Sequence, residues 1–225
     1  MSLIFNNIDK MSFDDLGEES EFIPLMTSED EEALEKESLP EVLPILPLTN
    51  TVLFPGVVIP INAGRDKSIK LINDANKSNK LIGVVAQKDI KIENPSIEDI
   101  FNIGTVAKIL RVLKMPDGNT TVIIQGKKRF KIKSVVKTDP YIQATINSIT
   151  DKNQKKSNSK FTATIDAIKD IALKIIKENP NIPSEASFAI KNIHSSAFLI
   201  NFVCSNMNIS VKDKQDLLSS LYIEN

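Results

Sequence analysis

The stretch from residue 41 to residue 61 reads Glu41-Val-Leu-Pro-Ile-Leu-Pro-Leu-Thr-Asn-Thr-Val-Leu-Phe-Pro-Gly-Val-Val-Ile-Pro-Ile61. It is strongly apolar, yet four prolines interrupt it. Because proline has no backbone N–H to donate, it belongs at strand ends, edges and bulges rather than in central strands. The stretch therefore predicts two short strands, at about 42–47 and 57–61, joined by a loop that Pro55-Gly56 closes.

The strand pattern continues as far as residue 149. A run of β-branched residues at 81–87 predicts a buried strand, and alternating apolar residues predict strands at 104–114, 120–125, 130–135 and 141–149. The sequence Met115-Pro-Asp-Gly-Asn119 signals a hairpin turn, since proline presets φ and glycine permits positive φ. Helical spacing appears at 67–77, with Asp66 as the expected N-cap, and Ser96 begins a single helical turn.

After a polar segment at 151–160 the periodicity becomes helical. Apolar residues recur at helical spacing from Phe161 to Ile175, and Asn179-Pro180 ends that segment. Further helical faces follow at 186–193 and 198–203, and Ser210 starts a last helix. Its apolar stripe runs up to the end of the chain, so we expect a piece of a longer protein.

These patterns predict an α+β protein in four parts. An arm occupies residues 1–41, a β domain 42–150, a linker 151–160 and a small helical bundle 161–225.

Charge is distributed unevenly along the 225 residues. The whole chain has 28 basic and 29 acidic residues, but residues 1–41 hold thirteen of the acids and two of the bases. The arm therefore carries a charge of −11 and the rest of the chain +10. We expect the arm to be disordered, because it repels itself and buries little. It is interpreted as a solubilising tail, or as a tail that folds back on the basic body or screens it from nucleic acid.

Composition excludes several classes of protein. No apolar run approaches the ~18–20 residues of a membrane span, and the start lacks the features of a signal peptide. The single cysteine, Cys204, excludes an internal disulfide framework and fits a reducing cytosol. With one histidine as well, zinc sites built from Cys/His clusters are excluded. We expect a cytoplasmic protein with no membrane partner and no metal.

Signatures of catalysis are missing from the sequence. It has no G-x-x-x-x-G-K-[ST] loop, no G-x-G-x-x-G fingerprint and no G-x-S-x-G elbow. His194 and Cys204 are interpreted as structural residues, and Glu98-Asp99 as part of a helix start. We therefore predict no catalytic residue and no cofactor-binding residue in this chain.

One basic run, Lys127-Lys-Arg-Phe-Lys-Ile-Lys133, is long enough to interact with phosphates. As a strand it places its cations on one face and Phe130 and Ile132 on the other. The simplest interpretation is a solvated strand face. Nucleic-acid binding is the alternative, although the basic face offers no aromatic residue on which bases could stack.

The stretch at 43–61 resembles the amino-terminal domain of the Lon family of ATP-dependent serine proteases. The resemblance covers roughly residues 42–218 and continues through 64–68, 103–110, 126–130, 198–202 and 211–218. Thr49 departs from the pattern, because the family usually has Arg at that position.

The resemblance implies a PUA-like β pseudo-barrel followed by a helical bundle, and a non-catalytic role. The domain would recognise unfolded or damaged proteins and help a homo-hexamer to assemble. ATP, Mg²⁺, the AAA+ ATPase module and the serine peptidase module would belong to the full-length protein. The alternatives are a stand-alone Lon-like binding module and a nucleic-acid-binding PUA-like module.

Apolar residues at turns mark the expected substrate-binding site. Turns run over the surface, so an apolar side chain there is either tucked into the core or available for contact. Met115, at the hairpin tip, is predicted to contact unfolded segments, with Phe54 and Leu53 as secondary residues. Phe54 lies between two strands that share a core, which also makes it a candidate core residue.

Overall fold

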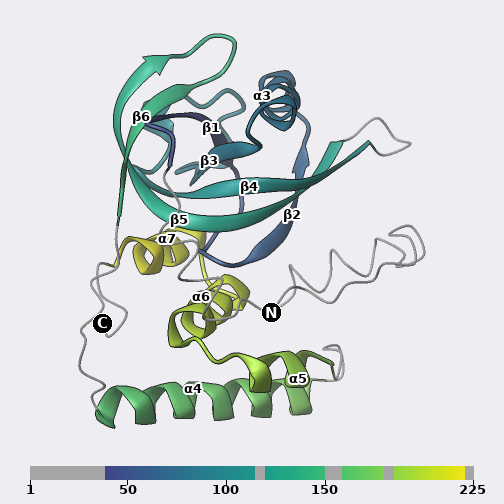
Figure 1. The fold of residues 1–225 in the computed structure, drawn as a ribbon, viewed down its shortest axis with the longest axis vertical. Coiled ribbons are helices and arrows are strands. Elements are labelled where there is room, and N and C mark those ends of the chain that lie inside the picture. The colour runs from purple at the N-terminus through teal and green to yellow at the C-terminus, as the bar shows by residue number, and fades with distance from the viewer. Residues whose placement is uncertain (1–38, 115–119, 150–158, 180–184, 221–225) are drawn as a thin grey trace.

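The computed structural model describes residues 39–114, 120–149, 159–179 and 185–220. The strands and one helix come first: β1 (Val42–Leu48), β2 (Val58–Ala63), α3 (Asp66–Lys77), β3 (Leu81–Ala86), the 3-10 turn η2 (Ile97–Asp99), β4 (Ile103–Lys114), β5 (Thr120–Lys137) and β6 (Gln143–Ser148). The helices α4 (Ser159–Glu178), α5 (Glu185–Asn192), α6 (Ser196–Asn206) and α7 (Val211–Ser219) follow. The strands lie above these four helices (Figure 1), so the predicted α+β class is confirmed.

The six strands form one strongly curved sheet. Its order is β2-β5-β4-β3-β1-β6, and β5 also pairs with β6, which makes the sheet a pseudo-barrel. Strands β1 and β3 run parallel, whereas the other pairs are antiparallel. Register shifts between Ile132 and Ser134, and between Val135 and Lys137, bend β5 where it leaves β4 for β6.

The sequence predicted separate strands at 120–125 and 130–135, and this was wrong. Strand β5 is continuous over 18 residues. Gly126 pairs with Ala107 and Arg129 with Thr105, and Lys127 and Lys128 lie at the register shift between these two pairs. The strand therefore continues through the basic run with an irregularity rather than a break.

Helix α3 packs against β1 and β3 and buries Leu71, Ile72 and Ala75. Its N-cap is Arg65, not Asp66 as the sequence predicted, and the Arg65 side chain makes no capping hydrogen bond. Asp66 instead stands in the first turn, where a negative charge favours the helix dipole.

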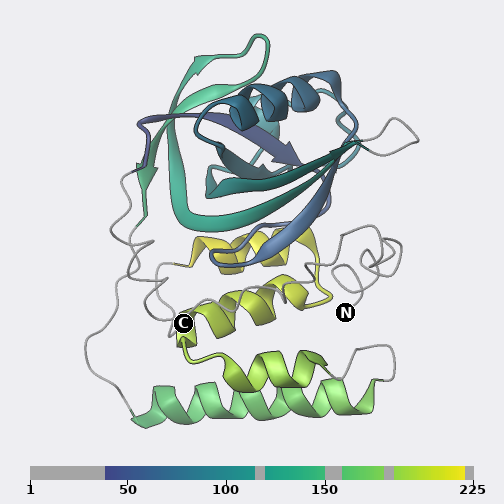
Figure 2. The same ribbon diagram turned by 45° about the vertical axis from the view of Figure 1, so that its right-hand side comes forward.

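The four later helices stack in layers away from the sheet, in the order α7, α6, α5 and α4 (Figure 2). Ser195 caps α6, since its Oγ accepts from the Phe198 N–H at 3.0 Å. Ser210 caps α7 in the same way through the Asp213 N–H at 3.1 Å, as the sequence predicted. One cluster of buried residues contains Leu46 and Val122 of the sheet together with Phe198 and Leu218 of the helices, so both parts share a core.

Candidate functional site

Two of the three residues predicted to contact substrate are buried. Leu53 and Phe54 are each 2% exposed and belong to the core, so neither side chain reaches the surface in this structure. The core interpretation of Phe54 is therefore confirmed. Met115 lies outside the described residues.

Hydrogen bonds hold the loop between β1 and β2 against the sheet. The Thr105 hydroxyl donates to the Leu53 carbonyl at 2.6 Å. Gly56 and Gly126 then join the loop to β5: the Gly56 N–H donates to the Gly126 carbonyl, and the Gly126 N–H donates to the Val57 carbonyl, both at 2.9 Å. Gly56 takes a φ of 78°, which glycine adopts at little cost. A loop attached in this way turns its apolar side chains inward.

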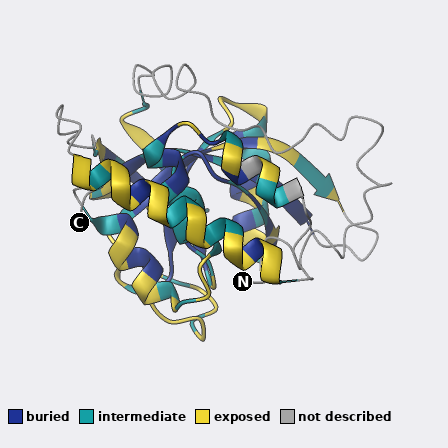
Figure 3. Cartoon of the chain, turned by 90° about the horizontal axis from the view of Figure 1, so that it is seen from below, coloured by how far each residue is buried: buried dark blue, intermediate teal, exposed yellow. Residues whose placement is uncertain are grey.

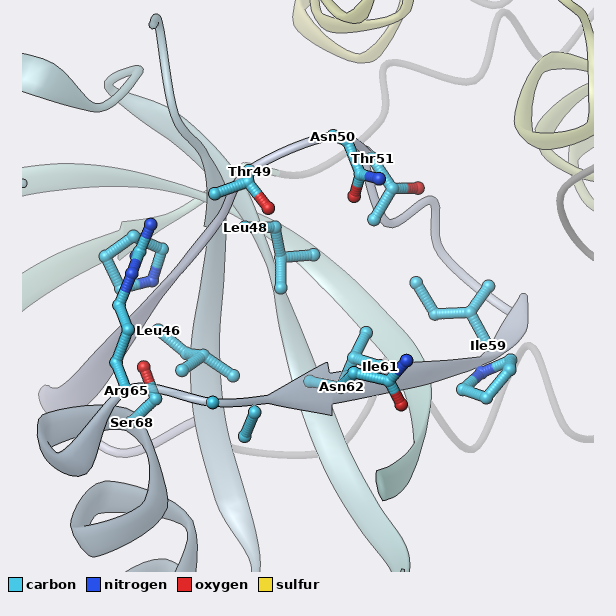
Figure 4. A pocket seen from close by; sticks show the side chains of 14 residues that line it. Leu46, Leu48, Thr49, Asn50, Thr51, Ile59, Ile61, Asn62, Arg65 and Ser68 are labelled. Atoms are coloured by element: carbon cyan, nitrogen blue, oxygen red, sulfur yellow. The ribbon is translucent and has the colours of Figure 1, made fainter. Parts of the chain in front are cut away.

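Beside this loop lies a pocket of about 370 Å³, between the end of β1, the strand β2 and the start of α3. Its apolar surface comes from Leu46, Leu48, Ile59 and Ile61, and its polar rim from Thr49, Asn50, Thr51, Asn62, Arg65 and Ser68 (Figure 4). No residue that lines it is acidic. The position where the family usually has Arg, Thr49, is part of its wall.

Arg65 is the only charged residue in the pocket wall. Its Nη2 donates to Gln87 Oε1 at 3.0 Å. Gln87 is itself buried, and its amide nitrogen donates to the carbonyls of Asp89 and Ile92, both at 2.6 Å. These bonds hold the guanidinium at the rim, and they carry no negative charge that would neutralise it.

Large apolar side chains are exposed on the outermost helices. Ile171 and Ile175, one turn apart on α4, are 60% and 40% exposed, and Phe188 on α5 is 63% exposed. In the view from below, α4 is the helix nearest the reader and is exposed along much of its length (Figure 3). The helical spacing that ends at Ile175 predicted this helix correctly, and the structure leaves the Ile175 side chain exposed.

The residues of the basic run on β5 differ in how far they are buried. Lys131 and Lys133 are exposed, whereas Phe130 is fully buried and cannot stack on a base. Arg129 is 8% exposed, and its Nη1 donates to the carbonyls of Leu218, at 2.7 Å, and Ser220 at the end of α7. Burial lowers the pKa of this guanidinium. The sequence held no signal for this contact, because its partners lie about ninety residues away.

The other residues with reactive groups have structural surroundings. Burial raises the pKa of the half-buried Cys204 thiol, which disfavours the reactive thiolate. Ser96 donates to Asp99 Oδ2 from both its backbone N–H, at 2.8 Å, and its hydroxyl, at 2.7 Å. These bonds lower the pKa of the Asp99 carboxyl and confirm the predicted helix start.

The described part of the chain lacks both a cluster of metal ligands and a membrane-spanning helix. It contains no group of three or more His, Cys, Asp or Glu side chains that could hold a metal ion. None of its helices is long and apolar enough to cross a membrane.

Comparison with known proteins places the fold and the sequence in one family. The sequence profile of the ATP-dependent protease La (LON) substrate-binding domain matches residues 42–225. The chain is 63% identical over 212 residues to the Lon protease of Flavobacterium johnsoniae, a match that covers 94% of this chain and 26% of that protein. It is 52% identical over 198 residues to the Lon protease of Cytophaga hutchinsonii, covering 88% of this chain and 24% of that protein.

Solved structures agree on the fold. The N-terminal domain of a Mycobacterium avium complex Lon protease matches with a TM-score of 0.64 at 19% identity, over 81% of this chain and 91% of that one. A Lon N-terminal domain protein from Xanthomonas campestris matches with a TM-score of 0.59 at 15% identity, over 81% and 92%. The chain belongs to the Lon substrate-binding domain family, as the resemblance implied. It spans about a quarter of the length of the curated Lon proteases that it matches.

Proposed function

We propose that this chain is the substrate-recognition part of a cytoplasmic, ATP-dependent Lon protease. It binds unfolded or damaged proteins and presents them to ATPase and peptidase modules encoded outside these 225 residues. Support comes from the family of substrate-binding domains to which the chain belongs. The lone Cys204 is consistent with a reducing compartment. Other subunits of the same protein, in a homo-hexamer, are the second class of partner.

The exposed apolar side chains of α4 and α5 are the observation that carries this proposal. Folded proteins bury most large apolar residues, and exposed apolar groups often mark contact surfaces. Ile171 and Phe188 are each at least 60% exposed. An unfolded polypeptide exposes apolar segments that a folded protein hides, so such side chains favour unfolded chains over folded ones. Weak contacts of this kind gain strength when several subunits act together.

The test measures fluorescence anisotropy of a labelled, reduced and alkylated polypeptide that cannot fold. Ile171→Asp and Phe188→Asp should each weaken its binding by about tenfold, because burying a large apolar side chain contributes roughly 1.5 kcal/mol or more. The melting temperature should hardly change, since both residues are already exposed. Thr162→Asp, an exposed polar position on α4, is the matched control. If Ile171→Asp and Phe188→Asp both bind the polypeptide as tightly as the parent chain does, α4 and α5 are not part of the binding site.

Met115, which lies outside the described residues, remains a proposed contact because the sequence predicts a hairpin turn at 115–119. Met115→Asp should weaken binding of the same polypeptide without changing the melting temperature. Phe54→Asp should instead lower the melting temperature, because it buries a charge in the core. Equal binding by Met115→Asp and the parent chain would contradict the hairpin-tip assignment.

A further inference from the structure

The pocket beside β2 has an unpaired strand edge along one side. Strand β2 pairs with β5 from Val58↔Gln125 to Ala63↔Thr120, and no other described strand pairs with it. Residues 59–63 of β2 line the pocket. An unpaired edge offers backbone N–H and carbonyl groups to an extended polypeptide, except at Pro60, which has a carbonyl but no N–H. The pocket is therefore shaped for a peptide backbone as well as for side chains.

The start of helix α3 opens onto the same pocket through Gly64, Arg65 and Ser68 (Figure 4). The first N–H groups of a helix lack partners within the helix and attract negative charge. Here the N-cap side chain makes no capping hydrogen bond. A β-carbon built on Gly64 would meet no atom within 4 Å, so the backbone is open to an incoming group.

Ser68 provides a second, independent indication of a ligand. The residue is 8% exposed and lines the pocket, and among the described residues nothing hydrogen-bonds its hydroxyl. The hydroxyl oxygen is not one of the fully buried atoms without a partner, so it is accessible from the pocket. In Figure 4 the hydroxyl of Ser68 lies beside Arg65, on the pocket side of the helix. Helix N–H groups, a hydroxyl and a guanidinium together form a set of donors that suits an anion with several acceptor oxygens.

We propose that this pocket binds the C-terminal carboxylate of a polypeptide whose last residue is apolar. The carboxylate lies at the start of α3, among the helix N–H groups, Ser68 and Arg65. The last side chain packs on Leu46, Leu48 and Ile61, and the preceding residues extend along the free edge of β2. This deepens the proposed function and rests on it, because it adds recognition of chain ends to recognition of unfolded segments.

The apolar lining and the volume of the pocket favour a chain end over a free anion. A free phosphate would use the donors but leave Leu46, Leu48 and Ile61 without an apolar partner. A volume of about 370 Å³ lies within the range of small-ligand sites. It has room for an apolar side chain beside the carboxylate.

The experiment uses the complete 225-residue chain and a short fluorescein-labelled peptide that ends in leucine. Three forms of the peptide are compared by anisotropy: one with a free carboxylate, one with a C-terminal amide, and an amidated form with an internal glutamate. The free acid should bind about tenfold or more tightly than either amide, because charge-assisted hydrogen bonds are lost in both. Inorganic phosphate at millimolar concentration should compete only weakly.

Variants locate the effect. Ser68→Ala and Arg65→Gln should each weaken binding of the free acid severalfold and weaken binding of the amide by a smaller factor. Ser68→Ala keeps the helix intact, since alanine favours helices and the hydroxyl has no partner within the described residues to lose. Lys67→Gln is the matched control, because it removes one positive charge from an exposed side chain on the same turn that does not line the pocket. Backbone amide resonances of residues 64–68 should shift with the acid and not with the amide.

The outcomes separate this inference from the proposed function. Equal binding of acid and amide, or equal loss from Lys67→Gln and Arg65→Gln, would overturn the carboxylate site. If unfolded polypeptide still binds in that case, the proposed function stands without it. If neither the peptide nor the unfolded polypeptide binds, the proposed function fails as well.

Discussion

Arg129 connects the sheet to the last helix. Its guanidinium donates to the Leu218 and Ser220 carbonyls at the end of α7. We expect Arg129→Met to lower the free energy of unfolding by about 2 kcal/mol, because two carbonyls lose a charged donor and the buried bond to Leu218 is not replaced by water. Chemical denaturation measures this. Lys131→Met, an exposed position on the same strand, should change it by less than about 0.5 kcal/mol. Similar losses in both variants would mean that Arg129 adds nothing to this junction.

Lys214 makes stability depend on pH in the alkaline range. It is 7% exposed, and its Nζ donates to the Ser205 carbonyl at 2.7 Å. Burial lowers the pKa of Lys214, so between its folded and unfolded pKa values the unfolded chain binds more protons. Its contribution to stability therefore rises with pH through the folded pKa. Relative to Lys214→Met, the parent chain should gain stability from neutral pH toward about 10. A stability difference that stays constant or falls over that range would contradict this.

The position of the loop between β1 and β2 depends on the close approach of the Phe54 backbone to Gly126 of β5. A β-carbon on Gly126 would collide with the backbone carbonyl of Phe54. Because backbone atoms cannot move aside cheaply, Gly126→Ala should destabilise the fold by roughly 1–3 kcal/mol. Gly64→Ala is the control, since an added methyl group there meets open space. Thermal unfolding of Gly126→Ala and Gly64→Ala measures this difference. Equal melting temperatures for the two variants would show that the loop is not held against β5.

At the scale of the whole molecule, the sheet and the helices share one buried cluster. We expect the 225-residue chain to unfold in one transition, because neither part can lose its packing without exposing the other's apolar surface. Far-ultraviolet circular dichroism and amide resonances from β4 and α6 should give the same midpoint. An earlier midpoint for α6 would show that the helices unfold independently of the sheet.

Much of this architecture could be predicted from local patterns. Alternation and helical periodicity predicted the order of strands and helices, and serines followed three residues later by an acid predicted the starts of η2 and α7. These predictions succeed because the residues that determine each feature lie close together in the chain. A hydroxyl can cap the turn that follows it whatever the rest of the molecule does.

The candidate site depended on tertiary structure. Turn chemistry placed Leu53 and Phe54 in a loop, but only the approach of β4 and β5 turned their side chains into the core. The pocket combines β1, β2 and the start of α3, and the sequence did not indicate that Arg65 would be the N-cap or that Ser68 would lack a partner. Arg129 finds acceptors about ninety residues further along the chain. Periodicity reports which face of an element is apolar, whereas burial and hydrogen-bond partners are set by whichever distant segment packs there.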